Sequence, residues 1–191
     1  MAPQLTADET DELLYFSRAN EKEDLISQLQ ALAEREKVSP AEILTAARDE
    51  GKSTCLHMAT GNGHIDIVKA VLEPFASRPA QERQAFLDAA NEYGNTGLHW
   101  AALGGHLDTV RLLVEEGAAP ALANDKNYVP LDLASFGGKL DVVDYFLAQS
   151  GALESGNDEG LGGAAAGLEL EGEEVGDGWD GAGVGEVKKG T

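Results

Sequence analysis

One block of residues occurs twice in this chain almost unchanged, and a third time in altered form. It reads TCLHMATGNGH at 54–64, TGLHWAALGGH at 96–106 and VPLDLASFGGK at 129–139. The equivalent glycines Gly105 and Gly138 are 33 residues apart, while Gly63 and Gly105 are 42 apart, which is the same period with nine residues inserted. A period of this length indicates a supersecondary unit that buries its apolar face only by stacking on its neighbours.

The block resembles the Thr-Pro-Leu-His-x-Ala signature of the ankyrin repeat, whose period is 33 residues. The resemblance implies an all-α ankyrin-repeat solenoid of about four helix-turn-helix repeats. We place the repeat domain at 8–153, with repeats at 8–48, 49–90, 91–123 and 124–153. The first repeat lacks the Thr-x-x-His start, and we interpret it as a degenerate repeat that caps the stack. Long connectors after the first two repeats are predicted to carry extra helices, at 40–48 and 81–90.

The last segment, 154–191, is predicted to be a disordered acidic, glycine-rich tail. Residues 151–191 contain 13 glycines interleaved with ten acids. Such a composition cannot bury enough apolar surface to offset the loss of chain entropy on folding. Two functions stay open for the tail, a solubilising brush or a mobile polyanion that screens the basic residues of a partner. Trp179 is a candidate for a weak contact within it.

The net charge of −20 limits the class of partner. Residues 1–150 carry 24 acids and 12 bases (net −12), and residues 151–191 carry ten acids and two lysines (net −8). A polyanion repels such a surface, so direct nucleic-acid binding is disfavoured. A basic protein is the electrostatic complement.

Cysteine use and hydropathy indicate a soluble intracellular protein. Cys55, the single cysteine, cannot form an internal bridge, and we expect it to be buried and inert. The N-terminus is too acidic and polar for a signal peptide, and no apolar run approaches the ~20 residues that span a bilayer.

The ankyrin resemblance assigns structural roles to the histidines. It implies that the Thr54 hydroxyl bonds the His57 ring, that Thr96 does the same for His99, and that each imidazole then bonds backbone groups of a turn. A metal site is the competing interpretation of four histidines, but they all occupy signature positions, so no metal, cofactor or enzymatic activity is expected. The structural set is Thr54, His57, Gly63, His64, Thr96, His99, Gly105, His106 and Gly138.

Ankyrin repeats bind partners on a concave side formed by the turn tips and the solvent-facing side of the inner helices. Mapped onto this chain, that side is acidic and aromatic, with Lys126 as its only base. Whether Tyr93 and Tyr128 are free or stack on neighbouring turns stays open, while Trp100 is expected to be buried. The candidate partner-binding residues are Glu50, Ser53, Glu92, Tyr93, Asn95, Leu103, Asp125, Lys126, Tyr128 and Phe136.

The connector pattern, the acidity and the blocks at 53–73 and 94–112 resemble a narrower group, the fungal ankyrin-repeat chaperones of the KH-domain ribosomal protein of the small subunit. The resemblance implies a chaperone that captures this basic client by its N-terminal helical segment and keeps it soluble on its way to the nucleus. We expect a monomer that is cytoplasmic and shuttles to the nucleus. The alternative is a general ankyrin adaptor or scaffold that binds or inhibits a signalling or transcription protein.

Overall fold

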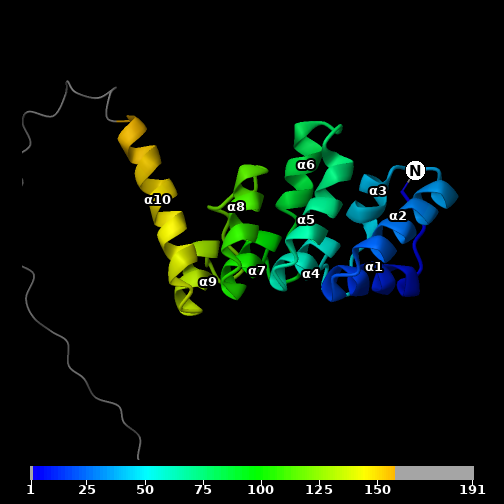
Figure 1. Cartoon of the computed structure of the whole chain (residues 1–191), viewed down its shortest axis with the longest axis horizontal. Coiled ribbons are helices and arrows are strands. Elements are labelled where there is room, and N and C mark those ends of the chain that lie inside the picture. Colours follow the sequence, from blue (N-terminus) through cyan, green and yellow to red (C-terminus); the bar gives the residue numbers. More distant parts are fainter. Residues whose placement is uncertain (1, 158–191) are drawn as a thin grey trace, which may run out of the picture.

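The computed structural model describes residues 2–157, and for 151–157 it describes the backbone alone. All regular structure in this range is helical. Four antiparallel helix pairs stand side by side in a row (Figure 1), which confirms the predicted helical solenoid. The pairs are α1 (Ala7–Ala19) with α2 (Lys22–Glu36), α4 (Cys55–Gly61) with α5 (Ile65–Leu72), α7 (Gly97–Gly104) with α8 (Leu107–Glu115), and α9 (Pro130–Phe136) with α10 (Leu140–Asn157).

The inner helices α1, α4, α7 and α9 pack on one another in chain order. They approach closely because small residues, Ala59, Ala101 and Ala134, are fully buried between them. Around them one continuous apolar core runs through all four repeats. Each repeat therefore buries its apolar face against its neighbours.

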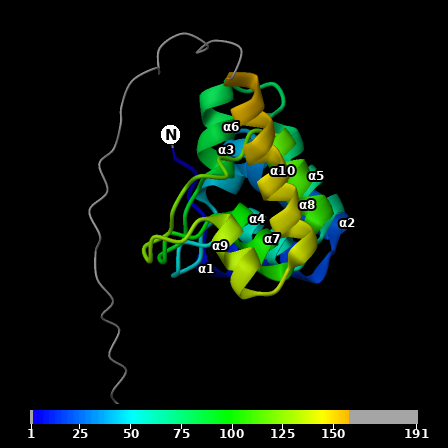
Figure 2. The same cartoon turned by 90° about the vertical axis from the view of Figure 1, so that its left-hand side faces the viewer.

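Both long connectors are folded. The first carries α3 (Pro40–Ala46), which Ser39 caps by accepting a hydrogen bond from the backbone N–H of Glu42. The second carries a 3-10 turn, η1 (Glu73–Phe75), and α6 (Ala80–Leu87). Phe75 stacks on Phe86 with ring centroids 4.4 Å apart. The α3 and α6 helices lie together along one edge of the row (Figures 1 and 2).

Helix α10 continues to Asn157, four residues past the predicted end of the repeat domain at 153. The predicted disorder of the remaining tail, 158–191, lies outside the described residues. Within the described range, no helix is both long and apolar enough to cross a membrane.

Candidate partner-binding surface

Three turns of the same construction precede α4, α7 and α9, at residues 49–53, 91–95 and 124–128. In the second turn, the Asn91 side-chain oxygen accepts hydrogen bonds from the backbone N–H groups of Tyr93 and Asn95, both at 3.0 Å. In the third turn, Asn124 does the same for Lys126 and Tyr128. An Asn or Asp at this position fixes a tight turn because its side chain replaces a backbone acceptor.

One residue in each turn has a left-handed backbone, namely Lys52 (φ 62°), Gly94 (φ 73°) and Asn127 (φ 61°). At Gly94 the turn also demands the smallest residue, since a Cβ there would lie 2.7 Å from the backbone nitrogen of Asp125.

Hydrogen bonds join neighbouring turns into one edge. The Glu92 N–H donates to the Gly51 carbonyl at 2.8 Å, and the Asp125 N–H donates to the Tyr93 carbonyl at 3.1 Å. The Asn124 amide also donates to the Asn95 side-chain oxygen at 2.8 Å. Figure 2 shows the turns projecting together beyond the helices. We call these turns, together with the exposed sides of α1, α4, α7 and α9, the tip–helix surface.

The signature histidines hold the turns in place. The Thr54 N–H donates to His57 Nδ1 at 3.1 Å, so Nδ1 is unprotonated and Nε2–H donates to the Asn95 carbonyl at 2.9 Å. His99 has the same neighbours one repeat on, Thr96 at Nδ1 and the Tyr128 carbonyl at Nε2. Burial lowers the pKa of both imidazoles because it disfavours the charged form.

His64 and His106 make the complementary contacts with the preceding repeat. Their Nε2 atoms bond the carbonyls of Arg18, at 2.9 Å, and Gly61, at 3.1 Å. All four imidazoles therefore have structural partners, and among the described residues no group of three or more His, Cys, Asp or Glu could hold a metal ion.

Cys55 is fully buried, and burial raises the pKa of its thiol to about 11. The thiolate that would act as a nucleophile is therefore strongly disfavoured.

The predicted acids of the tip–helix surface form a regular row. Glu50, Glu92 and Asp125 occupy the same position in successive turns, and all three are exposed. Lys126, one residue further on in the third turn, is also exposed. The prediction that Lys126 is the only base here is wrong, since Lys52 lies exposed in the first turn.

The predicted aromatics have different surroundings. Tyr93 is 61% exposed, and the Glu92 carboxylate beside it raises the pKa of its hydroxyl. Tyr128 packs on Phe136 edge to face, with centroids 4.9 Å apart, although 37% of Tyr128 and 66% of Phe136 remain exposed. Tyr128 therefore packs on the inner helix of its own repeat.

The other three predicted residues differ in how available they are. Leu103 is exposed, on the solvent side of α7. Ser53 and Asn95 are half-buried, and the Asn95 side-chain oxygen is occupied by Asn124. Asn95 thus has a structural role whether or not it also contacts a partner.

Sequence reasoning missed the contribution of the first repeat. His64 bonds the Arg18 carbonyl as His106 bonds that of Gly61, so Arg18 of α1 is equivalent to Gly61 of α4. Tyr15 lies three residues before Arg18, as Met58 lies three residues before Gly61. Tyr15 is therefore equivalent to Met58 and to Trp100, and the three form a row across the inner helices. From the sequence, this equivalence could have been found only by aligning Leu13, Leu14 and Ser17 of α1 with Leu56, His57 and Thr60 of α4.

This row on the inner helices is partly open to solvent. Tyr15 is 49% exposed, and Met58, Trp100 and Leu133 are half-buried. Trp100 is therefore less buried than expected, and it lies against Gly61 of the preceding repeat.

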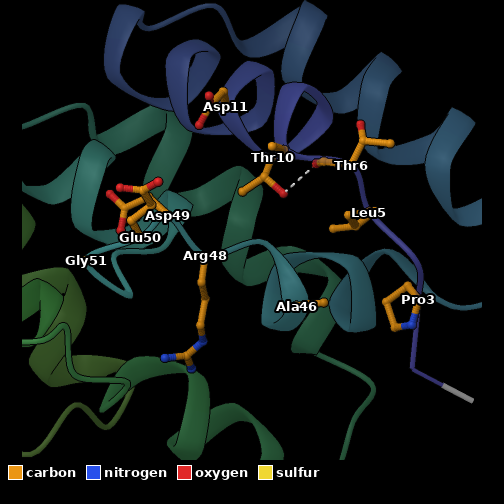
Figure 3. A pocket seen from close by; sticks show the side chains of 11 residues that line it. Pro3, Leu5, Thr6, Thr10, Asp11, Ala46, Arg48, Asp49, Glu50 and Gly51 are labelled. Carbon is orange, nitrogen blue, oxygen red and sulfur yellow. Dashed lines mark hydrogen bonds between the residues drawn. The ribbon is translucent and has the colours of Figure 1, made fainter.

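A hollow of about 650 Å³ lies at the α1 end of the surface. It is lined by Leu5, Thr10, Asp11, Asp49 and Glu50, among others (Figure 3). Asp11 of α1 thus shares this hollow with Asp49 and Glu50 of the first turn, and Arg48 also lines it.

Comparisons with known proteins agree with this architecture. The family described as "Ankyrin repeats (3 copies)" matches residues 81–157, and "Ankyrin repeat" matches residues 52–79. The chain is 39% identical over 145 residues to the ankyrin repeat-containing protein YAR1 of Saccharomyces cerevisiae, covering 75% of this chain and 70% of the yeast protein. It is also similar to a chain in the crystal structure of the yeast ribosomal protein Rps3 in complex with its chaperone Yar1. That match has a TM-score of 0.68 and 35% identity, and covers 76% of this chain and 95% of the other.

Proposed function

The chain belongs to the ankyrin-repeat family, and from this premise we propose that it is a dedicated chaperone of a basic small-subunit ribosomal protein, the counterpart of yeast Rps3. It captures this client, keeps it soluble and so supports ribosome assembly. The observation that carries the proposal is the likeness, over 95% of its length, to a chain in the Rps3–Yar1 structure. The comparisons do not favour the general adaptor as an alternative.

The tip–helix surface suits a basic client. Its row of exposed carboxylates, Glu50, Glu92 and Asp125, borders the apolar side chains Tyr15, Leu103 and Phe136 of the inner helices. Carboxylates increase the rate of encounter with a positively charged chain, while desolvated apolar contacts slow its release. An amphipathic helix with a basic face, such as the client's N-terminal segment, matches this arrangement.

The role is one of binding, not of catalysis. The described histidines are hydrogen-bonded to backbone carbonyls, and the cysteine is buried with a raised pKa. The chaperone acts as a monomer in the cytoplasm and accompanies its client to the nucleus. Imaging of a tagged chain while nuclear export is blocked tests this location, and a signal that never enters the nucleus contradicts the shuttling.

Charge reversal on the tips tests the binding surface. Glu92→Lys with Asp125→Lys should weaken client binding on the order of tenfold, about 1.4 kcal/mol, because lysines then face a basic client. The matched control is Asp66→Lys with Glu115→Lys, which makes the same charge change at exposed positions of the outer helices α5 and α8. Calorimetric titration with the purified ribosomal protein measures both variants. Equal affinity of the two variants would show that the client binds elsewhere.

A further inference from the structure

The two connector helices enclose a second surface, which the proposed function does not use. Between α3, η1 and α6 lies a hollow of about 670 Å³, which we call the connector groove. Its lining is mainly apolar and includes Ala41, Ala46, Phe75, Ala85 and Phe86. This volume is within the range that buries a small ligand or a large side chain.

The floor and walls of the connector groove differ in burial. The stacked rings of Phe75 and Phe86 and the methyl group of Ala41 are buried and form a rigid apolar base. Ala46 and Ala85 are exposed, and their small side chains leave the groove open. A flat aromatic side chain is the natural occupant, since it can pack on rings of its own kind.

The charged residues at the rim of the connector groove favour an acidic occupant. Glu42 is occupied in capping Ser39, and Glu82 pairs with Arg78 at 2.8 Å. Among the described side chains no carboxylate pairs with Arg48, and Figure 3 shows its guanidinium directed away from Asp49 and Glu50. An occupant with carboxylates beside its aromatic ring would therefore complement the groove.

The chain contains one such segment beyond the described residues. Trp179 is the only aromatic residue after 157, and Asp177 and Asp180 flank it. Trp179 lies 22 positions after Asn157, and an extended chain of this length reaches roughly 70 Å. The groove lies about three helix-packing steps from α10, or roughly 30 Å. The C-terminal end of α10 is on the same side of the molecule as α3 and α6 (Figures 1 and 2).

We propose that the connector groove is a docking site for the chain's own C-terminal segment, with the Trp179 ring on Phe75 and Phe86 and with the flanking carboxylates of Asp177 and Asp180 beside Arg48. Because the segment is tethered, its effective concentration at the groove is on the order of 1 mM, so a weak intrinsic affinity is sufficient. Docking would hold the acidic tail against the first two repeats, beside the hollow at the α1 end of the tip–helix surface, since the two share Ala46 and Arg48 in their linings.

Trp179 fluorescence in the full chain tests this without any client. In a Trp100→Phe background Trp179 is the only fluorescent tryptophan. We expect its emission at shorter wavelength, and its quenching by acrylamide lower, than in the same chain carrying Ala46→Glu and Ala85→Glu, which place carboxylates in the groove walls. The control, Ala31→Glu with Ala121→Glu, adds the same charge at exposed positions outside the groove and should leave both signals unchanged.

Two outcomes would overturn the proposal. One is equal quenching of Trp179 in the parent chain and in the Ala46→Glu, Ala85→Glu variant. The other is protection that grows with protein concentration, which would mean that Trp179 binds a second copy. A peptide spanning 172–183, added to a full chain carrying Trp100→Phe and Trp179→Ala, should bind with a Kd of about 1 mM or tighter.

Discussion

At the scale of single residues, the Thr-x-x-His pair explains why the block at 54–64 recurs at 96–106. The imidazole accepts a hydrogen bond from the backbone N–H of the threonine that caps the inner helix and, through its other ring nitrogen, donates to a carbonyl of the next turn. The pairing of threonine with histidine and the bond to the turn were predicted from the ankyrin resemblance of the sequence. The sequence could not show that Lys52 has a left-handed backbone, because nothing in a lysine side chain favours that conformation.

We expect His99→Ala to lower the free energy of unfolding by about 2–4 kcal/mol, because it leaves the Thr96 N–H and the Tyr128 carbonyl without partners in a buried site. Urea denaturation measures the loss. Tyr93→Ala is the control, since this exposed side chain should change stability by no more than about 0.5 kcal/mol. Similar losses in the two variants would contradict the structural role of His99.

Stability should also depend on pH through the two buried imidazoles. The pKa values of His57 and His99 are lowered by burial, so the unfolded chain binds protons that the folded chain does not. This contribution to stability is complete above the unfolded pKa of about 6.5 and is lost as the pH falls below it. The urea midpoint should therefore fall between pH 7.5 and 5.5, and fall less in a His57→Gln, His99→Gln variant. An identical fall in both proteins would assign the effect to other groups.

At the scale of elements, the ankyrin resemblance together with amphipathic spacing was sufficient to predict the helix pairs, and helix start signals such as Ser39 before Pro40 predicted the first connector helix. The register of α1 was not predictable, because the first repeat lacks the motif and is positioned instead by contacts such as that of His64 with the Arg18 carbonyl. The packing of Tyr128 on Phe136 joins a turn to a helix eight residues later, a relation that periodicity does not encode. The candidate binding residues stay a prediction, with their positions now known.

Two glycines with positive φ, one in a turn and one before α10, separate the cost of backbone conformation from that of steric clash. Gly94→Ala should destabilise more than Gly138→Ala, although both glycines have positive φ, because only the Cβ at 94 would clash with backbone. The left-handed conformation alone costs about 1–2 kcal/mol for alanine, and we expect the Gly94 variant to lose more than that. Thermal denaturation of both variants gives the order, and a greater loss at Gly138 would refute this account of the 91–95 turn.

At the scale of the whole molecule, the charge of −20 and the row of carboxylates on the tips act together over distances longer than a contact. Charge of this kind acts mainly on the rate of encounter, while the apolar side chains of α1, α7 and α9 determine how long a client stays. The two contributions should therefore separate in kinetics.

Raising the salt concentration from low to physiological strength shortens the screening length to about 8 Å. We expect the association rate constant with the ribosomal protein to fall steeply over this range and the dissociation rate constant to change little, as measured by stopped-flow fluorescence. In the Glu92→Lys, Asp125→Lys variant the salt dependence of association should be weaker. A salt effect confined to dissociation would contradict electrostatic steering.

The fourth repeat has Val129 and Asp132 in place of the threonine and histidine, and its Asp132 carboxylate accepts a hydrogen bond from the Val129 N–H. An ionised carboxylate has no proton to donate, so this side chain cannot reach out to the carbonyl of a following turn as His57 and His99 do. Anyone engineering a longer array from this scaffold must therefore restore threonine and histidine at these two positions before grafting another unit onto α9 and α10.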